Sequence, residues 1–419
     1  MRVVSGRAYF GGALQSVDIG IEDGKIAVIR KSLRGGEKRY DFGDAILLPG
    51  GVDLHVHFRE PGLTDKDDFA SGTRSAAIGG VTAVLEMPNT IPPVTDRVSF
   101  EQKLALARRS ANVDFALAIA PLDATALAKN PRAPAAKVYM AESTGGLVVP
   151  DPRVLGEILE AAAGAGTLVS VHCEDPSEFR PGPARDLAGH DAARPATSEV
   201  SAVKALLSLR GRARVHIAHA TLAEVLHMRP DGVTAEVTPH HLLLDTSSRL
   251  GAQGKVNPPL RTAADREALW KAVFAGKADA FASDHAPHTL EEKSLPFDEA
   301  PSGVPGVATT LPLLMRHVRR GTFSLDRFVA MFSANPARIL GANKGEIAVG
   351  RDADLVAVDP RRVVRITAKR CGYKCGWTPF EGHEGVFPIA TFVRGRLVAR
   401  DGELAEERVG EPITVPESS

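Results

Sequence analysis

The chain has 419 residues, of which 44% are hydrophobic and 24% are charged, and its 51 basic residues equal its 51 acidic ones. This length allows one large domain with a smaller one beside it. The balanced charge gives no reason to expect nucleic acid or a membrane surface as a partner. No run of about 18 apolar residues predicts a membrane span.

Three cysteines, Cys173, Cys371 and Cys375, are too few for a disulfide framework and fit a reducing compartment. The N-terminal segment MRVVSGRAYF has no long apolar run and no small-residue cleavage site, so no signal peptide is expected. We therefore expect a cytoplasmic protein.

Both ends of the chain predict short strands joined by tight turns. Asp18–Glu22 and Lys25–Arg30 flank an Asp-Gly turn, and Gly345–Asp359 and Ile389–Arg400 repeat this style near the C-terminus, followed by a second Asp-Gly turn. The economical interpretation is one small β domain built from both ends, with a large domain inserted between them.

The middle of the chain alternates buried strands with helices. Helical stretches include Phe100–Ala111, Val154–Ala165 and Ala264–Ala275. Eight strand–helix units over roughly 290 residues are typical of a TIM barrel. A doubly wound open sheet is the alternative, but no glycine-rich phosphate turn follows the first strand. The predicted strands are Val52–His57, Val81–Met87, Asp114–Ala120, Ala136–Met140, Leu168–Cys173, Arg214–Ala218, Val233–Val237 and Ala278–Ser283.

We therefore predict an α/β fold in two parts. A TIM (β/α)8 barrel would span residues 51–343. A small β-sandwich domain would combine residues 1–50 with residues 344–419.

Nine of the 13 histidines lie at or just beyond the C-terminal ends of predicted strands. TIM-barrel chemistry is built at these ends, so the placement predicts an active site there. The nine are His55, His57, His172, His216, His219, His240, His241, His285 and His288.

His55 and His57 are two residues apart on the first predicted strand, so both side chains point to the same face and can share one metal ion. His172 and His219 could supply a second ion. Imidazole and carboxylate groups are natural zinc ligands. The alternative for the pair is two core histidines without a ligand.

Several motifs carry a resemblance to a known family. GVDLHVHFREPG at residues 51–62 and SDHAPHT at residues 283–289 resemble the signatures of dihydroorotases in the amidohydrolase superfamily. Four shorter motifs follow in the family's order: MPNT at 87–90, HCED at 172–175, TPHHL at 238–242 and VNPPLR at 256–261. The resemblance runs from about residue 45 to residue 400.

The resemblance implies two zinc ions, one held by His55, His57 and Asp284 and the other by His172 and His219. Members of the family differ at the bridging position, where some use an aspartate and others a carboxylated lysine. Lys137 matches the lysine version. A free ammonium would repel two zinc ions, whereas a carbamate on neutral lysine supplies a bridging anion. A structural lysine is the alternative. Of the two histidines in the sixth segment, His219 matches the ligand, and His216 is expected beside the site or in the core.

A dihydropyrimidine ring that carries a carboxylate requires a cation at the site. Arg59 lies two residues beyond His57 on the same face, and its planar fork suits a carboxylate. The resemblance adds Asn89, Asn257 and His288 as substrate contacts and Ser302 with Gly303 as a backbone contact to the ring. Loop capping is the alternative for the two asparagines, and a surface loop position is the alternative for His288.

The resemblance implies reversible opening of dihydroorotate to N-carbamoyl-aspartate, a step of pyrimidine biosynthesis. Asp284 would bind zinc and also carry the proton between the attacking water and the ring nitrogen. Allantoinase and hydantoinase or dihydropyrimidinase activities are the rivals within enzymes, and Arg59 and the segment at 286–288 disfavour them. A metal-free scaffold homologue is the rival outside enzymes, but every ligand position is filled here.

Two charged runs allow simpler interpretations. The run at residues 65–68, DKDD, is expected to be a solvated helix start with a structural role. Glu291 and Glu292 follow the last barrel strand and could belong to a loop over the site. The expected partner is the small-molecule substrate, without nucleic acid or membrane, and the resemblance makes a homodimer plausible.

Overall fold

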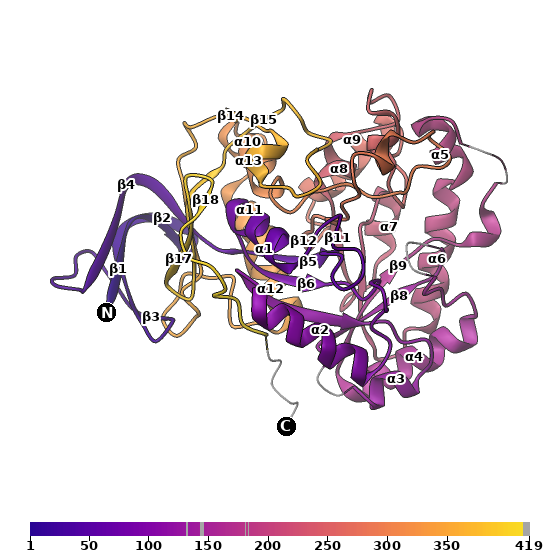
Figure 1. The fold of residues 1–419 in the computed structure, drawn as a ribbon, viewed down its shortest axis with the longest axis horizontal. Coiled ribbons are helices and arrows are strands. Elements are labelled where there is room, and N and C mark those ends of the chain that lie inside the picture. The colour runs from indigo at the N-terminus through magenta and orange to yellow at the C-terminus, as the bar shows by residue number, and fades with distance from the viewer. Residues whose placement is uncertain (131–132, 143–145, 181, 183, 414–419) are drawn as a thin grey trace.

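The computed structural model describes residues 1–130, 133–142, 146–180, 182 and 184–413. Within these residues the strands form two large sheets. One sheet is a barrel ringed by helices, and the other combines both ends of the chain beside it (Figure 1). In this described part, no helix combines the length and the apolar character that crossing a membrane requires.

The barrel confirms the predicted TIM fold. Its strands, eight among the described residues, are parallel and pair in chain order. The ring closes where Val56 bridges His285 and the His57 N–H donates to the His285 carbonyl at 2.8 Å. The strands are β5 (Gly51–Val56), β6 (Val81–Glu86), β7 (Asp114–Ile119), β8 (Ala135–Tyr139), β9 (Leu168–His172), β10 (Arg214–Ile217), β11 (Thr234–Val237) and β12 (Ala280–Phe281).

Continuous apolar runs made these strands easy to locate, because helices cover the outer face of a barrel and side chains fill its interior. Every residue of β6 and of β7 is buried. Each strand lies within its predicted segment or extends one residue before it. The strand β12 is shorter than Ala278–Ser283 because it pairs with β11 only through Ala280 and Phe281.

Capping residues set the helix boundaries. The Asp96 carboxylate accepts from the Ser99 N–H and starts α2 one turn before its predicted start. Gly166, with φ 68°, ends α4 in the left-handed conformation that glycine adopts without strain. The α-helices are α1 (Phe69–Ile78), α2 (Arg97–Ser110), α3 (Thr125–Ala128), α4 (Pro152–Ala165), α5 (Leu187–Ala193), α6 (Ala196–Leu209), α7 (Ala223–Met228), α8 (Pro239–Leu243), α9 (Ala263–Phe274), α10 (Thr310–Arg319), α11 (Leu325–Val329), α12 (Asn335–Leu340) and α13 (Ala368–Cys371). Short 3-10 helices span Pro176–Glu178, Gly251–Gly254 and Glu292–Ser294, and a π-helical turn spans Ala330–Ala334.

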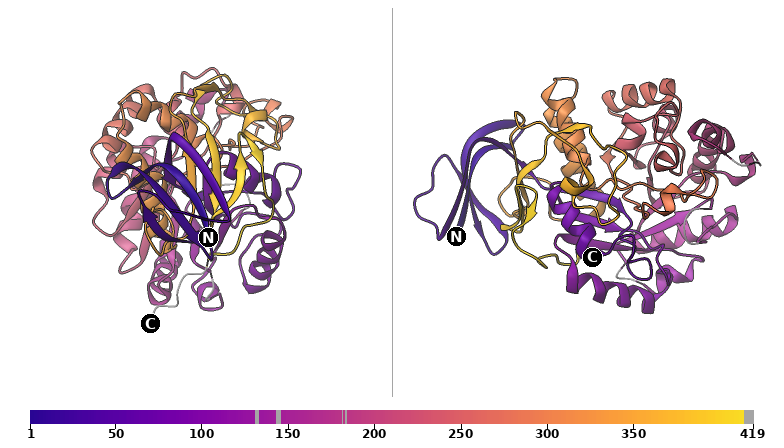
Figure 2. Two further views of the ribbon diagram at one scale, coloured as in Figure 1. Left: turned by 90° about the vertical axis from the view of Figure 1, so that its left-hand side faces the viewer. Right: turned by 45° about the horizontal axis from the view of Figure 1, so that its top comes forward.

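The second sheet confirms that the two chain ends fold together. Its strand order is β18-β17-β16-β13-β4-β1-β2-β3, so β4 from the N-terminal end pairs with β13 from the C-terminal end (Figure 2). The strands are β1 (Arg2–Phe10), β2 (Ala13–Glu22), β3 (Lys25–Arg30), β4 (Lys38–Pro49), β13 (Leu355–Val358), β16 (Pro388–Val393), β17 (Arg396–Arg400) and β18 (Glu403–Leu404). A separate pair, β14 (Val364–Arg365) and β15 (Glu384–Gly385), lies near α10.

This sheet encloses a core of its own, distinct from the barrel interior. Val4 and Ile19 from one half pack with Leu355 and Phe392 from the other half. Both predicted Asp-Gly turns are present, with positive φ at Asp23 and Gly24 and again at the turn between β17 and β18. The boundaries at residues 50/51 and 343/344 stay predictions.

Candidate active site

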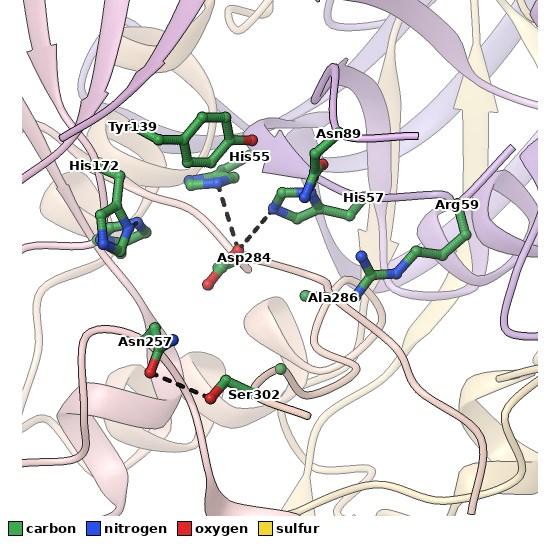
Figure 3. Close-up of a pocket in the computed structure, with 12 residues that line it drawn as sticks. His55, His57, Arg59, Asn89, Tyr139, His172, Asn257, Asp284, Ala286 and Ser302 are labelled. Carbon is green, nitrogen blue, oxygen red and sulfur yellow. Dashed lines mark hydrogen bonds and ion pairs between the residues drawn. The ribbon is translucent and has the colours of Figure 1, made fainter. Parts of the chain in front are cut away.

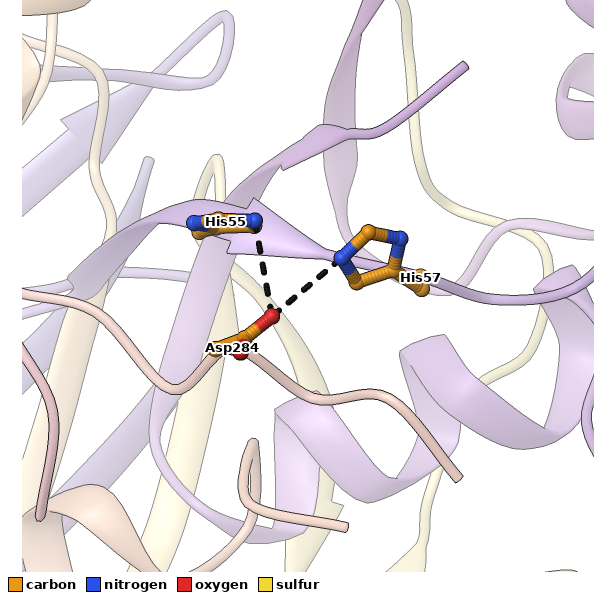
Figure 4. Close-up of side chains that lie close together, drawn as sticks. All are labelled: His55, His57 and Asp284. Carbon is orange, nitrogen blue, oxygen red and sulfur yellow. Dashed lines mark ion pairs between the residues drawn. The ribbon is translucent and has the colours of Figure 1, made fainter. Parts of the chain in front are cut away.

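His55 lies near the C-terminal end of β5, His57 directly follows the strand, and both side chains point toward Asp284 (Figure 4). The Nδ1 atom of His55 lies 2.6 Å from Glu236 Oε1, and Nδ1 of His57 lies 2.6 Å from Asn89 Oδ1. An oxygen acceptor at Nδ1 places the ring proton there and leaves the lone pair on Nε2. Both Nε2 atoms face Asp284.

Asp284 follows β12 and completes a group of three ligands. Its Oδ1 atom lies 3.4 Å from His55 Nε2 and 3.2 Å from His57 Nε2, and the three ligand atoms all lie within 4.8 Å of one another. Burial alone would raise the pKa of Asp284, but the neighbouring histidines, His55 first, hold it well below its usual value. Lone pairs of nitrogen and oxygen that converge in this way are stabilised by a cation between them.

A second group lies next to the first. Nδ1 of His172 is 3.1 Å from Nε2 of His219, and the His219 ring centroid is 5.2 Å from that of His55. Nε2 of His172 lies 2.8 Å from Glu174 Oε2, which leaves its Nδ1 lone pair facing His219. Two nitrogens that share one tetrahedral zinc at about 2.0–2.1 Å lie roughly 3.3–3.4 Å apart. The donor sets of both groups therefore fit a metal ion.

Lys137 contacts the first of these two groups. It is 1% exposed, and its Nζ is 3.3 Å from His55 Nε2. Among the described residues, no carboxylate oxygen lies within 4.0 Å of this Nζ. Burial lowers the pKa of Lys137 to about 8, which favours the neutral amine.

Arg59 lies on the wall of the same pocket and is 1% exposed. Its Nε donates to the Pro287 carbonyl at 3.0 Å, and one terminal nitrogen lies 3.2 Å from His288 Nε2. Both partners are neutral, and within the described residues no carboxylate forms an ion pair with this guanidinium. A buried cation without a counter-ion is suited to an anionic ligand.

The remaining wall of the pocket places polar groups opposite the histidines (Figure 3). Asn257 Oδ1 lies 2.9 Å from His190 Nε2 and accepts from the Ser302 hydroxyl at 3.2 Å, so its amide nitrogen is left for a ligand. Gly303 has φ 138°, and a Cβ there would approach the Ala286 carbonyl oxygen to 2.5 Å. Glycine is therefore required at this position of the pocket wall.

The structure thus brings together the residues predicted from the sequence. The pocket is lined by His55, His57, Arg59, Asn89, His172, His219, Asn257, Asp284, Ser302 and Gly303 from that prediction. Lys137 contacts His55, and His288 contacts Arg59 behind the pocket wall. His216 lies beside the site, 2.9 Å from Glu236 Oε2.

Sequence reasoning missed the carboxylates that orient the histidines. Glu236 lies between His55 and His216, and Glu174 holds His172 while it pairs with Arg194. Both are completely buried. A charged residue inside an apolar strand, as Glu236 is in β11, was the signal available for it.

The run at residues 65–68 was predicted to be a solvated helix start, and this prediction is wrong in part. Asp68 does cap α1. Lys66 and Asp67, however, are 8% and 3% exposed, because they contact the segment after β12. Lys66 Nζ lies 2.6 Å from Glu292 Oε1 and 3.2 Å from His288 Nδ1, and Asp67 Oδ2 lies 2.8 Å from His285 Nε2.

Comparison with known proteins agrees with this geometry. The model of the amidohydrolase family matches residues 46–398. The chain is 40% identical to a dihydroorotase from Methanosarcina acetivorans over 94% of this chain and 90% of that protein. It is 39% identical to a dihydroorotase from Halobacterium salinarum, over 95% and 96%. Among solved structures, the L-hydantoinase (dihydropyrimidinase) from Arthrobacter aurescens superposes with a TM-score of 0.92 at 29% identity and covers 99% of both chains. The chain therefore belongs to the amidohydrolase family.

Proposed function

We propose that the protein is a dihydroorotase, which interconverts dihydroorotate and N-carbamoyl-aspartate in pyrimidine biosynthesis. The observation that carries the proposal is the buried guanidinium of Arg59, which has no carboxylate partner among the described residues and lies beside the group of His55, His57 and Asp284. A carboxylate on the substrate would neutralise it. Relatives named dihydroorotase at 39–40% identity, against 29% for the solved hydantoinase, support the same choice.

We propose further that two zinc ions are bound, with His55, His57 and Asp284 at one and His172 and His219 at the other. Lys137, as its carbamate, would bridge them. Zinc would supply Lewis-acid polarisation of the amide carbonyl and would lower the pKa of the attacking water. The buried lysine without a carboxylate partner within the described residues supports the carbamate, since carboxylation requires a neutral amine.

The chain's own residues then divide the remaining work. Arg59 binds the substrate carboxylate, Asn89 and Asn257 orient the ring, and Ser302 and Gly303 offer backbone groups. His288 takes part in substrate binding through its contact with Arg59. Asp284 moves the proton. Its Oδ1 faces the two histidines, whereas Oδ2 has no partner among the described residues and can take a proton from water and pass it to the ring nitrogen as the C–N bond breaks (Figure 3).

The deciding experiment is an assay of the purified protein on dihydroorotate, dihydrouracil, hydantoin and allantoin side by side, with elemental analysis of the same preparation. We expect turnover of dihydroorotate to exceed turnover of the other three substrates by at least about 10²-fold. We also expect a zinc content close to two ions per chain, because both donor groups would be filled. Preference for an uncharged ring would instead indicate a hydantoinase or allantoinase. Full activity without metal would refute the zinc proposal.

Lys137→Ala tests the carbamate. The variant should lose one metal and most activity, and a short carboxylic acid should restore part of both. Cytoplasmic location and a homodimer complete the proposal, and light scattering of the purified chain checks the latter.

A further inference from the structure

Tyr139 is a polar group in the pocket to which the proposed function gives no role. It is the last residue of β8, two positions beyond Lys137, so both side chains point into the barrel. Tyr139 lines the pocket together with His55, Arg59 and Asp284. In Figure 3 its ring lies over His55, and its hydroxyl points to the side of the pocket where Asn89 lies.

The hydroxyl of Tyr139 is buried without a hydrogen-bond partner among the described residues. The whole residue is only 3% exposed. Buried polar groups are nearly always paired, because an unpaired one forfeits its hydrogen bonds to water. Tyr373, also buried, shows the usual arrangement, since its hydroxyl accepts from the Ala308 N–H at 3.1 Å. An unpaired hydroxyl that lines a ligand pocket is available to a ligand.

The backbone of Tyr139 is fixed on both sides. Tyr139 pairs with His172 in the neighbouring strand β9, and its carbonyl accepts from the Val149 N–H at 2.8 Å. Its ring lies 5.4 Å from Lys137 Nζ and has its centroid 6.3 Å from that of the His172 ring. The hydroxyl is therefore held in place before a substrate arrives, as electrostatic stabilisation of a transition state requires.

We propose that Tyr139 is a catalytic residue that donates a hydrogen bond to the carbonyl oxygen of the amide under attack. The proposal rests on the proposed function. As the water oxygen bonds to the carbonyl carbon, the π electron pair moves onto the carbonyl oxygen, which becomes negative. The phenol keeps its proton, since its ordinary pKa is about 10, and its hydrogen bond strengthens as that charge grows. The proton of the water goes to Asp284 and then to the leaving nitrogen.

Tyr139→Phe tests the proposal, because it keeps the buried ring and removes only the hydroxyl. We expect kcat to fall about 10²- to 10³-fold, the usual effect of removing one oxyanion donor, with KM within about threefold. Zinc content should be unchanged. The melting temperature should stay the same or rise, because the hydroxyl has no partner in the free protein.

Tyr373→Phe is the matched control. It removes a paired hydroxyl from another buried tyrosine, so its melting temperature should fall while kcat stays within a few-fold of the parent. A catalytic hydroxyl should therefore affect kcat but not the melting temperature, whereas a structural hydroxyl should affect the melting temperature but not kcat.

Three outcomes would overturn the proposal. One is a Tyr139→Phe enzyme with the parental kcat. Another is a rise in KM alone, which would place the hydroxyl on the substrate carboxylate instead. The third is loss of zinc or of thermal stability together with activity, which would make Tyr139 structural. If the parent protein turns over another cyclic amide and not dihydroorotate, the proposed function fails, and the same comparison of kcat on that substrate still tests Tyr139.

Discussion

Three residues of the site have backbone conformations that ordinary side chains avoid. Arg59 has φ 64°, His219 has φ 37° and Asp284 has φ 44°. A left-handed conformation costs about 1–2 kcal/mol for a residue other than glycine, asparagine or aspartate. Each of the three follows the end of a barrel strand, where the unusual turn directs the side chain inward. Arg59 and His219 therefore carry this strain at the site, as Arg394 and Arg408 do elsewhere in the chain.

Asp284→Asn tests the proton transfer without altering this backbone, because asparagine tolerates positive φ as well as aspartate does. The amide can still offer one oxygen to zinc but cannot carry a proton. We expect much of the metal to remain and kcat to fall by at least about 10²-fold, the scale of a positioned acid–base group. Turnover within a few-fold of the parent at full metal content would move this role to another residue, and His288 would be the next candidate.

Arg59→Met tests recognition of the carboxylate. Loss of a charge-assisted hydrogen bond costs roughly 1.5–3 kcal/mol, or about 10- to 150-fold in kcat/KM on dihydroorotate. This loss in kcat/KM should come mainly from a higher KM. Hydrolysis of dihydrouracil, which lacks the carboxylate, should not fall. Arg59→Lys keeps the charge but not the planar fork, so its kcat/KM on dihydroorotate should lie between that of the parent and that of Arg59→Met. Equal losses on both substrates would show that the variant disturbs the site as a whole.

At the scale of elements, two loops contact each other where the barrel closes between β5 and the segment after β12. The loop between β5 and α1 supplies Lys66 and Asp67, and the segment after β12 supplies His285, His288 and Glu292. Nδ1 of His288 lies 3.2 Å from the Lys66 ammonium and 3.5 Å from Glu292 Oε2, and its Nε2 lies 3.0 Å from the Ser302 carbonyl and 3.2 Å from an Arg59 nitrogen. The pair of loops thereby fixes the histidine that contacts Arg59.

Lys66→Met should therefore weaken binding of an anionic substrate. Losing one hydrogen bond of this kind costs about 1 kcal/mol, so KM for dihydroorotate should rise roughly fivefold while zinc content stays constant. Lys374→Met is the control, since Lys374 pairs with Asp68 in the same loop but does not contact His288. Steady-state kinetics on both variants would check this, and an unchanged KM for Lys66→Met would contradict it.

Local sequence patterns predicted the helices and strands well. Contacts between residues far apart in the sequence could not be predicted in this way. The barrel strands are apolar runs, and histidines at their ends mark the site, so both could be predicted from neighbouring residues. The contact between Lys66 and Glu292 joins residues 226 positions apart. In sequence, Lys66 belongs to an acidic run that resembles any exposed helix start. From the sequence, Tyr139 is indistinguishable from the other apolar residues of its strand. The structure places it in the lining of the pocket and leaves its buried hydroxyl without a partner among the described residues.

For the whole molecule, the junction between the barrel and the second sheet is a cluster of buried charges. Lys344 Nζ lies 2.7 Å from Asp114 Oδ2, 2.8 Å from Asp354 Oδ2 and 3.2 Å from Asp352 Oδ2. Asp114 begins β7, Asp354 precedes β13, and Arg394 from the turn between β16 and β17 also pairs with Asp114. One lysine thus joins the N-terminal end of the barrel to the sheet made by both chain ends.

Lys344→Met should destabilise the fold and leave catalysis intact. Removing one partner from a buried ion cluster costs roughly 3–5 kcal/mol, because the remaining carboxylates keep their burial and lose their cation. The cluster lies at the end of the barrel opposite the site, where residues serve stability. We therefore expect a lower unfolding midpoint in urea, with parental kcat and zinc content at low temperature. Lys25→Met removes the half-exposed partner of Asp352 and should change the free energy of unfolding by less than about 1 kcal/mol.

The loss of unfolding free energy in Lys344→Met should depend on pH, and this dependence is a sharper test than the size of the loss. Burial would lower the pKa of Lys344, but Asp354, Asp114 and Asp352 together raise it. A cation with a raised pKa contributes its full stability below its unfolded pKa of about 10.4, so this contribution is constant between pH 5 and 9. In Lys344→Met the carboxyls of Asp352 and Asp354 lose the cation that lowers their pKa values, so these pKa values rise and protonation relieves the repulsion as the pH falls. The difference in unfolding free energy between parent and variant should therefore be largest near pH 8 and shrink toward pH 5. A difference that is equal at both pH values would mean that Lys344 contributes through packing alone.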